Sequence, residues 1–209
     1  MLHVLEAIGE AGGPAERSLD AQSAAIDALL ARGRAAGTPI DDVVREFARG
    51  HGVRDAEALV GLYRRRCLEL VDALVIPEAR VAEIVAALSD RGVSVAVLSN
   101  GWEPLQSAKA RRAGFAGGPI LTSGTLGVGK PEPAAFGALL TALGTAADRT
   151  WYVGDDPSGD IAGAQAAGLW AIWARAGADS YPAALPQPDA VLDAFGDLLE
   201  LLPGASGAS

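Results

Sequence analysis

Apolar residues recur at helical spacing through the first third of the chain, with almost no strand pattern among them. This spacing predicts helices over residues 15–37, 38–50 and 54–74. Thr38 is expected to cap the second helix, with Pro39 at its first position. In the third helix one face carries Leu59, Leu62, Tyr63, Leu70 and Leu74. Residues 1–76 are therefore predicted to form an all-helical unit.

The pattern changes after residue 76, where short apolar runs alternate with amphipathic stretches. The runs predict strands over residues 93–99, 119–123, 150–154 and 169–174, and a last strand followed by a helix within 189–202. Helices are predicted over residues 77–92, 102–114, 131–144 and 158–168. Strands separated by helices of about 10–15 residues are typical of a parallel sheet with helices on both faces. We therefore predict an α/β core over residues 77–202 and a disordered tail over 203–209.

The composition argues against several classes of protein. Arginine and lysine number 17 against 26 acidic residues, a net charge of −9, which disfavours binding to nucleic acid or to an anionic membrane. Cys67 is the single cysteine, so no internal disulfide can form. No apolar run reaches the roughly 20 residues that cross a bilayer, and the N-terminus lacks the basic start of a secretory signal. We expect a cytoplasmic protein without a nucleic-acid or membrane partner.

Polar residues lie where three of the predicted strands end or the next helix begins. They are Ser99 and Asn100 after strand 93–99, Lys130 before helix 131–144, and Asp155, Asp156 and Asp160 after strand 150–154. Taken singly, each fits ordinary turn or cap chemistry. The carboxyl ends of parallel strands meet at one edge of a sheet, which is where ligands bind in such folds. Together these residues therefore indicate a site for a phosphoryl group.

Each residue type has a role in such a site. The Ser99 hydroxyl and nearby backbone N–H groups would bind phosphoryl oxygens, with Asn100 beside them, and Lys130 would offset the negative charge. Asp155 would hold Mg²⁺, a hard cation that takes few carboxylates. Asp160 is expected at the same metal site, through a water or a neighbouring ligand. We predict catalytic roles for Ser99 and Lys130, substrate binding by these two and Asn100, and a metal site at Asp155 and Asp160.

Three segments in order carry a family resemblance: VLSNG (97–101), KPEP (130–133) and VGDDPSGDI (153–161). They resemble motifs two, three and four of the haloacid dehalogenase-like hydrolase superfamily. The helical unit resembles the small cap of its phosphatase-type branch. The resemblance implies a Rossmann-like core, Mg²⁺, and a phosphatase reaction on a small phosphorylated molecule through an aspartyl-phosphate intermediate. Asp156 stays open between a solvated turn residue and a secondary metal ligand.

The first motif of that superfamily, Asp-x-Asp, does not occur in the chain. Its first aspartate is the attacking nucleophile. In the interpretation we favour, the attacking strand lies upstream of Met1, because the apolar spacing of residues 2–8 is helical. In the other, residues 3–11 are a decayed first motif with Ala7 at the nucleophile's position and Gly9 two residues on. Either way the 209 residues are expected to be inactive or impaired as a phosphatase.

A missing central strand would leave a slot in the sheet with unpaired backbone groups. We expect either residues 1–8 to fill part of that slot or the two flanking strands to close up. Two other functions stay open. One is a non-catalytic phosphate-binding or regulatory protein of the same fold. The other is a 2-haloacid dehalogenase, which LSNG favours; dehalogenases of the superfamily use no metal, so the pair Asp155 and Asp160 argues against it.

Overall fold

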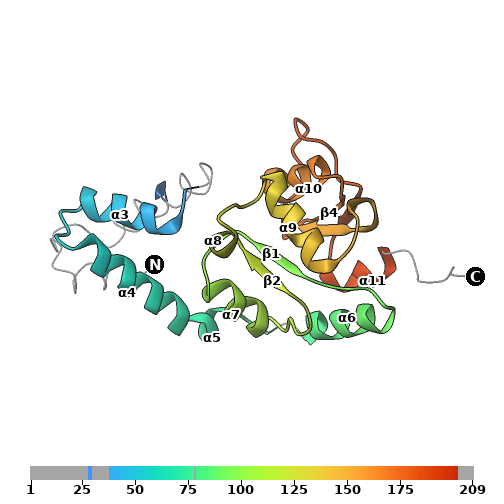
Figure 1. Ribbon diagram of the computed structural model, residues 1–209, viewed down its shortest axis with the longest axis horizontal. Helices are drawn as coiled ribbons and strands as arrows, with labels where there is room; N and C mark the ends of the chain where they lie inside the picture. The colour runs from blue at the N-terminus through green and yellow to red at the C-terminus, as the bar shows by residue number, and fades with distance from the viewer. Residues whose placement is uncertain (1–27, 30–37, 78, 202–209) are drawn as a thin grey trace, which may run out of the picture. The chain divides into compact units, whose positions relative to one another are not determined.

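The computed structural model describes residues 28–29, 38–77 and 79–201 (Figure 1). The chain divides into two compact units, Met1–Leu74 and Val75–Ser209. Most of the helix predicted over 15–37, and the tail predicted over 203–209, lie outside the described residues. Within the described residues, every helix is too short or too polar to span a bilayer.

In the first unit, helices α3 (Ile40–Gly50) and α4 (Ala56–Glu69) pack together, and α5 (Val71–Leu74) follows. Their shared core consists of Val44, Phe47, Ala48, Val53, Leu59 and Val60. The predicted Thr38 cap is wrong. Pro39 occupies the cap position of α3 in an extended conformation, and its carbonyl accepts the N–H groups of Asp42 and Val43 at 3.0 and 3.2 Å.

The single helix predicted over 54–74 is interrupted. Helix α4 ends at Glu69, and the N–H of Leu70 bonds the Arg66 carbonyl at 3.1 Å. Beyond this end Val71 is still buried, but Leu74 is 71% exposed, whereas Leu59 is fully buried. The helical class of the described part of this unit is as predicted, but its apolar face is shorter.

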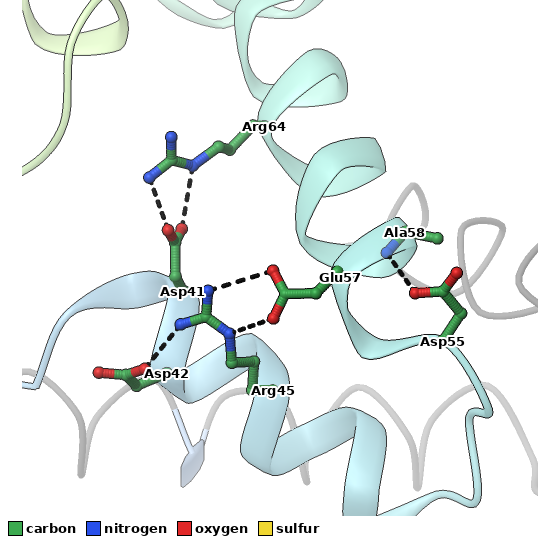
Figure 2. A network of polar contacts seen from close by, with 7 residues as sticks. All are labelled: Asp41, Asp42, Arg45, Asp55, Glu57, Ala58 and Arg64. Carbon is green, nitrogen blue, oxygen red and sulfur yellow. Dashed lines mark hydrogen bonds and ion pairs between the residues drawn. The ribbon is translucent and has the colours of Figure 1, made fainter.

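Ion pairs join α3 to α4 (Figure 2). The Arg64 guanidinium donates to both carboxylate oxygens of Asp41, at 3.0 and 2.6 Å. Arg45 donates to the two oxygens of Glu57 at 2.6 and 3.2 Å, and to Asp42 at 2.7 Å. The hydrogen bond from Arg45 lowers the pKa of Glu57 below its ordinary value. Most of these groups are at least one third exposed to solvent, so the pairs contribute little to stability and serve mainly to orient the helices.

The second unit alternates helices and strands. Its strands are β1 (Val97–Ser99), β2 (Ile120–Thr122), β3 (Trp151–Gly154), β4 (Trp170–Ala174) and β5 (Ala190–Leu192). Its α-helices are α6 (Ala79–Asp90), α7 (Leu105–Arg112), α8 (Ser123–Leu126), α9 (Pro133–Leu143), α10 (Gly163–Ala166) and α11 (Leu198–Leu201). A π-helical segment (Pro157–Ala162) precedes α10, and 3₁₀ turns cover Ala147–Arg149 and Phe195–Asp197. The predicted α/β class is confirmed.

Several elements of this unit differ from the prediction, among them the helix predicted over 158–168, which is a π-helical segment followed by the short α10. Strand β1 begins at Val97 rather than at residue 93, and its first bond runs from the Val97 N–H to the Pro119 carbonyl at 2.9 Å. Pro119 has no N–H to donate, so the ladder cannot extend from it in the usual way. Helix α8 was not predicted; Thr122 begins it, and Gly127 ends it in the left-handed conformation (φ 71°).

Among the described residues the strand pairs are all parallel, and they form two separate sheets. In one, β1 pairs with β2, with Leu98 opposite Leu121. In the other the order is β3-β4-β5, with Tyr152 opposite Ala171. Figure 1 shows α9 and α10 close to β4. One apolar cluster joins α9 and α10 to both sheets: Leu98, Ala135, Phe136, Leu139, Tyr152, Ile161, Ala164, Leu169, Ala171 and Trp173.

The other face of β4 and β5 lies under α6 and α11. Its core residues are Ile84, Leu88, Ile172, Leu192 and Leu198. Along β4, Ile172 points into this cluster while Ala171 and Trp173 point into the cluster of α9 and α10. This alternation gives the helix–sheet–helix layering of a parallel α/β protein.

Within the described residues, no strand pairing joins β1 to β3, although Leu98 and Tyr152 share one apolar cluster. The expectation that the strands beside a missing strand close up is therefore wrong for these two. Bringing them into register would displace the Tyr152 side chain, whose hydroxyl donates to the Leu98 carbonyl at 3.2 Å. The alternative expectation, that residues 1–8 fill the slot, lies outside the described residues.

Candidate functional site

The predicted site residues lie at the carboxyl ends of β1 and β3. Ser99 is the last residue of β1, and Asp155 follows β3 directly. Lys130 stands in the connection between α8 and α9, and Asp160 lies in the π-helical segment after β3. The structure brings Asn100, Lys130 and Asp160 into direct contact.

Lys130 forms a nearly buried ion pair. Its Nζ donates to Asp160 Oδ1 at 2.5 Å, and the two side chains are 14% and 6% exposed. The ammonium also lies 5.6 Å from the centroid of the Tyr152 ring. Burial alone would lower the pKa of Lys130, but the negative charges that Tyr152 and Asp160 can carry outweigh it, so the pKa is raised above its ordinary value. Lys130 therefore keeps its positive charge at neutral pH.

The Asn100 side chain holds the main chain of Lys130. Its Nδ2 donates to the Lys130 carbonyl and its Oδ1 accepts the Lys130 N–H, both at 2.8 Å. A Cβ on Gly129 would come within 2.6 Å of Asn100 Oδ1, so this approach requires glycine. The sequence predicts a substrate contact for Asn100, whereas the structure engages both ends of its amide with Lys130.

Ser99 makes a contact that the sequence does not predict. Its Oγ donates to Oε1 of Gln106, on α7, at 3.1 Å. The backbone turn after Ser99 is also fixed, because the Gly101 N–H donates to Ser123 Oγ at 2.9 Å. Gln106 adds a second polar side chain at the end of β1. It is the second residue of α7, and a glutamine there gives no sequence signal for such a role.

The three aspartates after β3 have different surroundings. Asp160 is 4% exposed, and while Lys130 holds its Oδ1, its Oδ2 accepts the Asp156 N–H at 3.1 Å. The Asp156 carboxylate accepts the Ser158 N–H at 3.0 Å and so caps the π-helical segment. Asp155 is exposed, and its backbone carbonyl is held by Trp173 Nε1 at 3.1 Å. Asp155 is thus the aspartate whose carboxylate faces solvent next to a fixed backbone.

The fit of a Mg²⁺ ion can be judged from these donors. No trio of His, Cys, Asp or Glu side chains in the described part of the chain is placed to hold a metal ion. Mg²⁺ in phosphoryl-transfer sites binds through one or two carboxylates, with waters and phosphate oxygens completing its shell. Asp155 fits this pattern. Asp160 is less available to a metal, because it is nearly buried and both its oxygens already accept hydrogen bonds.

Tyr152 is the site residue that the sequence analysis missed. It is 8% exposed, and its hydroxyl lies 3.4 Å from Asp160 Oδ1 as well as 3.2 Å from the Leu98 carbonyl. Burial raises the pKa of Tyr152 to about 12. The sequence did contain one indication of this role: Tyr152 places a hydroxyl in an otherwise apolar strand, and a buried hydroxyl needs a hydrogen-bonding partner.

A separate cavity of about 560 Å³ lies at the amino ends of β1 and β2. Apolar and small residues from α6, the two strand approaches and the end of α9 line it, among them Val85, Val95 and Leu143. Its lining contains no titratable side chain. The chemistry therefore gathers at the carboxyl ends of the strands, away from this cavity.

The layered parallel strands define a Rossmann-like α/β protein, with a lysine–carboxylate pair at their carboxyl ends. The chain belongs to the haloacid dehalogenase-like hydrolases, a family whose sequence profile matches residues 5–168. The predicted family and fold are thereby confirmed.

Two curated relatives that the sequence matches are phosphatases. A phosphoserine phosphatase of Thermus thermophilus is 34% identical over 166 residues, which are 73% of this chain and 65% of that protein. A phosphoglycolate phosphatase of Pectobacterium atrosepticum is 33% identical over 179 residues, 81% of this chain and 75% of that protein. The chain thus spans slightly under two thirds of the first relative and three quarters of the second.

Solved structures of the same family also match this chain. A 2-haloacid dehalogenase from Pseudomonas syringae has a TM-score of 0.67 and 25% identity, over 95% of this chain and 87% of that one. The HAD-hydrolase YfnB from Bacillus subtilis, bound to magnesium, has a TM-score of 0.69 and 20% identity, over 95% and 89%. The latter likeness shows the shared fold.

Proposed function

We propose that this chain is a Mg²⁺-dependent phosphatase acting on a small phosphorylated metabolite. The observation that carries the proposal is the nearly buried Lys130–Asp160 pair at the carboxyl ends of the strands, with Asn100 fixing the lysine backbone. A fixed ammonium in a site of low dielectric is suited to the negative charge of a phosphoryl group. The phosphatase relatives support this assignment over other hydrolase chemistry.

In this proposal each residue has a separate role in binding the phosphoryl group. The Lys130 ammonium offsets the charge on the phosphoryl oxygens, and Asp160 keeps it oriented. Ser99 turns its hydroxyl from Gln106 to a phosphoryl oxygen when the ligand enters. The Asp155 carboxylate holds Mg²⁺, which supplies further positive charge where the transition state gains negative charge.

Turnover also requires an attacking carboxylate, and the 209 residues contain no Asp-x-Asp. Loss of a covalent nucleophile costs on the order of 10⁴-fold in rate. We therefore expect the chain to bind inorganic phosphate in the presence of Mg²⁺ and to hydrolyse phosphomonoesters slowly. The variant Ala7→Asp tests the decayed-motif interpretation: a gain in rate supports it, and no gain favours an attacking strand from elsewhere.

The main experiment measures phosphate release from phosphoserine and phosphoglycolate, with Mg²⁺ and with chelator. We expect release that depends on Mg²⁺ and is lost in Asp155→Ala. Asp179→Ala, which removes an exposed loop carboxylate, is the matched control. Equal rates in chelator, or an unaffected Asp155→Ala variant, would contradict the proposal.

The same preparation separates the other candidate functions. Phosphate binding without turnover in the parent chain, together with turnover gained in Ala7→Asp, would favour a non-catalytic phosphate-binding protein with a decayed first motif. The dehalogenase of known structure motivates one further assay, chloride release from 2-chloropropionate without metal. Metal-independent chloride release would replace the phosphatase assignment.

A further inference from the structure

Tyr152 links the two sheets at the candidate site. Its backbone belongs to β3, and its hydroxyl donates to the Leu98 carbonyl of β1 at 3.2 Å. These two strands have no pairing between them in the described part of the chain. Adjacent strands lie about 4.8 Å apart, so a contact made through a whole tyrosine side chain indicates a wider separation. The phenol therefore ties strands that the backbone ladder does not join.

The same side chain touches the ion pair. The Tyr152 hydroxyl lies 3.4 Å from Asp160 Oδ1, the oxygen that Lys130 occupies. The Lys130 ammonium lies 5.6 Å from the Tyr152 ring centroid, a distance at which a cation is attracted to the ring. The ring is fixed in turn by an edge-to-face contact with Phe136, with centroids 5.2 Å apart. A rigid, buried phenol thus borders both charges.

Lys130 is consequently fixed at both ends. Asn100, next to the end of β1, fixes its backbone, and Asp160 beside Tyr152 fixes its ammonium. Because Tyr152 also bonds the backbone of β1, one side chain sets the ammonium's position relative to both strand ends. A displacement of about 1 Å of a group that stabilises charge can lower the reaction rate markedly.

We propose that Tyr152 is a positioning residue of this site, whose hydroxyl and ring hold the Lys130 ammonium in register with the end of β1. The inference rests on the proposed function for its consequence, phosphate binding, but its geometric part can be tested independently. Tyr152 touches no substrate; it acts through Lys130 and Asp160.

The composition makes a direct test possible. The chain has two lysines, Lys109 and Lys130, so ¹⁵N-lysine labelling of the full chain reports each ammonium separately by NMR. Lys109 is exposed on α7 and serves as the internal reference. The test variant is Tyr152→Phe, which removes only the hydroxyl.

Tyr181→Phe is the matched control. The Tyr181 hydroxyl also donates to a backbone carbonyl, that of Pro157 at 3.2 Å, and its ring also makes an edge-to-face contact, with Trp173 at 5.1 Å. Both substitutions thus remove a hydroxyl with a similar backbone bond, but only Tyr152 borders Lys130.

In Tyr152→Phe we expect the protons of the Lys130 ammonium to exchange with water at least about tenfold faster and its chemical shift to change. The reason is that the variant removes the hydroxyl that lies beside the Lys130–Asp160 pair. Lys109 should not change, and Tyr181→Phe should leave both signals in place. An unaltered Lys130 signal in folded Tyr152→Phe, or an equal change in Tyr181→Phe, would overturn the proposal.

If Tyr152→Phe does not fold, a second test changes Lys130 instead and observes the tyrosines. The chain has three tyrosines, so 3-fluorotyrosine gives three ¹⁹F signals. Lys130→Met should shift the Tyr152 signal and leave those of Tyr63 and Tyr181 in place. Three unmoved signals would overturn the proposal.

The functional consequence is measured with inorganic phosphate and Mg²⁺ by calorimetry. We expect a Kd about tenfold higher in Tyr152→Phe and within about twofold of the parent in Tyr181→Phe. Parent-like affinity in a Tyr152→Phe variant whose Lys130 signal has moved would overturn this functional part. If the parent chain binds no phosphate, the phosphatase proposal fails, while the lysine spectra still decide the role of Tyr152.

Discussion

Single residues at the ends of β1 and β3 are held by contacts that leave little room for substitution. Lys130 and Asp160 are both nearly buried, so removing one partner would leave an unpaired charge. The carboxylate of Asp160 in turn packs against the backbone of Gly154, the last residue of β3. The geometry of the ion pair therefore depends on a glycine that carries no chemistry itself.

The variant Gly154→Ala should disturb this pair. A Cβ at Gly154 would lie 2.4 Å from both Cβ and Oδ2 of Asp160, closer than non-bonded atoms allow. We expect a loss of about 1–3 kcal/mol in the free energy of unfolding, typical of overpacking a filled site. Urea denaturation measures it, and phosphate binding should weaken as well. A variant as stable as the parent would show that Asp160 can move aside freely.

Tyr152 makes the stability of the second unit depend on pH in the alkaline range. Its folded pKa, about 12, exceeds the ordinary 10.0, so between these values the folded chain keeps a proton that the unfolded chain releases. Stability from this group is complete below pH 10 and falls as pH rises toward 12, by up to about 1.4 kcal/mol per pH unit. Urea denaturation across this range should show a shallower fall in Tyr152→Phe. Parallel curves for the two proteins would contradict the assignment.

Sequence reasoning selected polar residues at strand ends, because these stand out from apolar runs, and their roles stay predictions. It did not anticipate the contacts that orient Lys130 or the part of Tyr152. The reciprocal bonds of Asn100 with Lys130 and the reach of Tyr152 depend on distances between segments at least 30 residues apart. No local pattern encodes such distances.

At the scale of elements, helix α9 shows how strongly local sequence can determine structure. Pro133 begins it and Gly144 ends it in the left-handed conformation (φ 66°), close to the predicted bounds. Strand β1 shows the opposite case, since its start depends on the strand that pairs with it rather than on its own residues. Element type was thus predictable throughout most of the second unit, and strand length was not.

Helix α9 also contains a glycine that can be replaced with benefit. Gly137 lies on its exposed side, and a Cβ there would meet no atom within 4 Å. Alanine loses less backbone entropy on folding than glycine in a helix interior, so Gly137→Ala should stabilise the protein by about 0.5–1 kcal/mol. Thermal or urea unfolding measures the gain. It also calibrates Gly154→Ala: the same substitution should have opposite signs at the two positions, and equal signs would contradict the contacts described for Gly154.

At the scale of the whole molecule, each unit has its own apolar clusters. The core of α3 and α4 contains only residues of the first unit, whereas the two clusters around the sheets contain only residues of the second. The change of hydrophobic pattern near residue 76 predicted a division of this kind. The separation of the described strands into two sheets, in contrast, could not be read from the residues of β1 or β3, because nothing in these strands themselves indicates an unpaired edge.

The connection between the units should be the preferred site of proteolysis. Leu74 and Ile76 are 71% and 83% exposed, the largest values among the exposed apolar side chains of the described residues. Neither belongs to the apolar cluster of either unit. A protease that selects large apolar residues should therefore cut between residues 74 and 77 and release a resistant fragment that contains β1 to β5. Mass spectrometry of that fragment's N-terminus is the measurement.

Two variants provide the control. Ile76→Asp should slow the cut at that bond, while Phe195→Asp, at a 40% exposed residue inside the second unit, should not. First cuts within α6 or α9 would mean that the second unit opens more readily than the connection, and that the layers around β3-β4-β5 are less stable than their burial indicates.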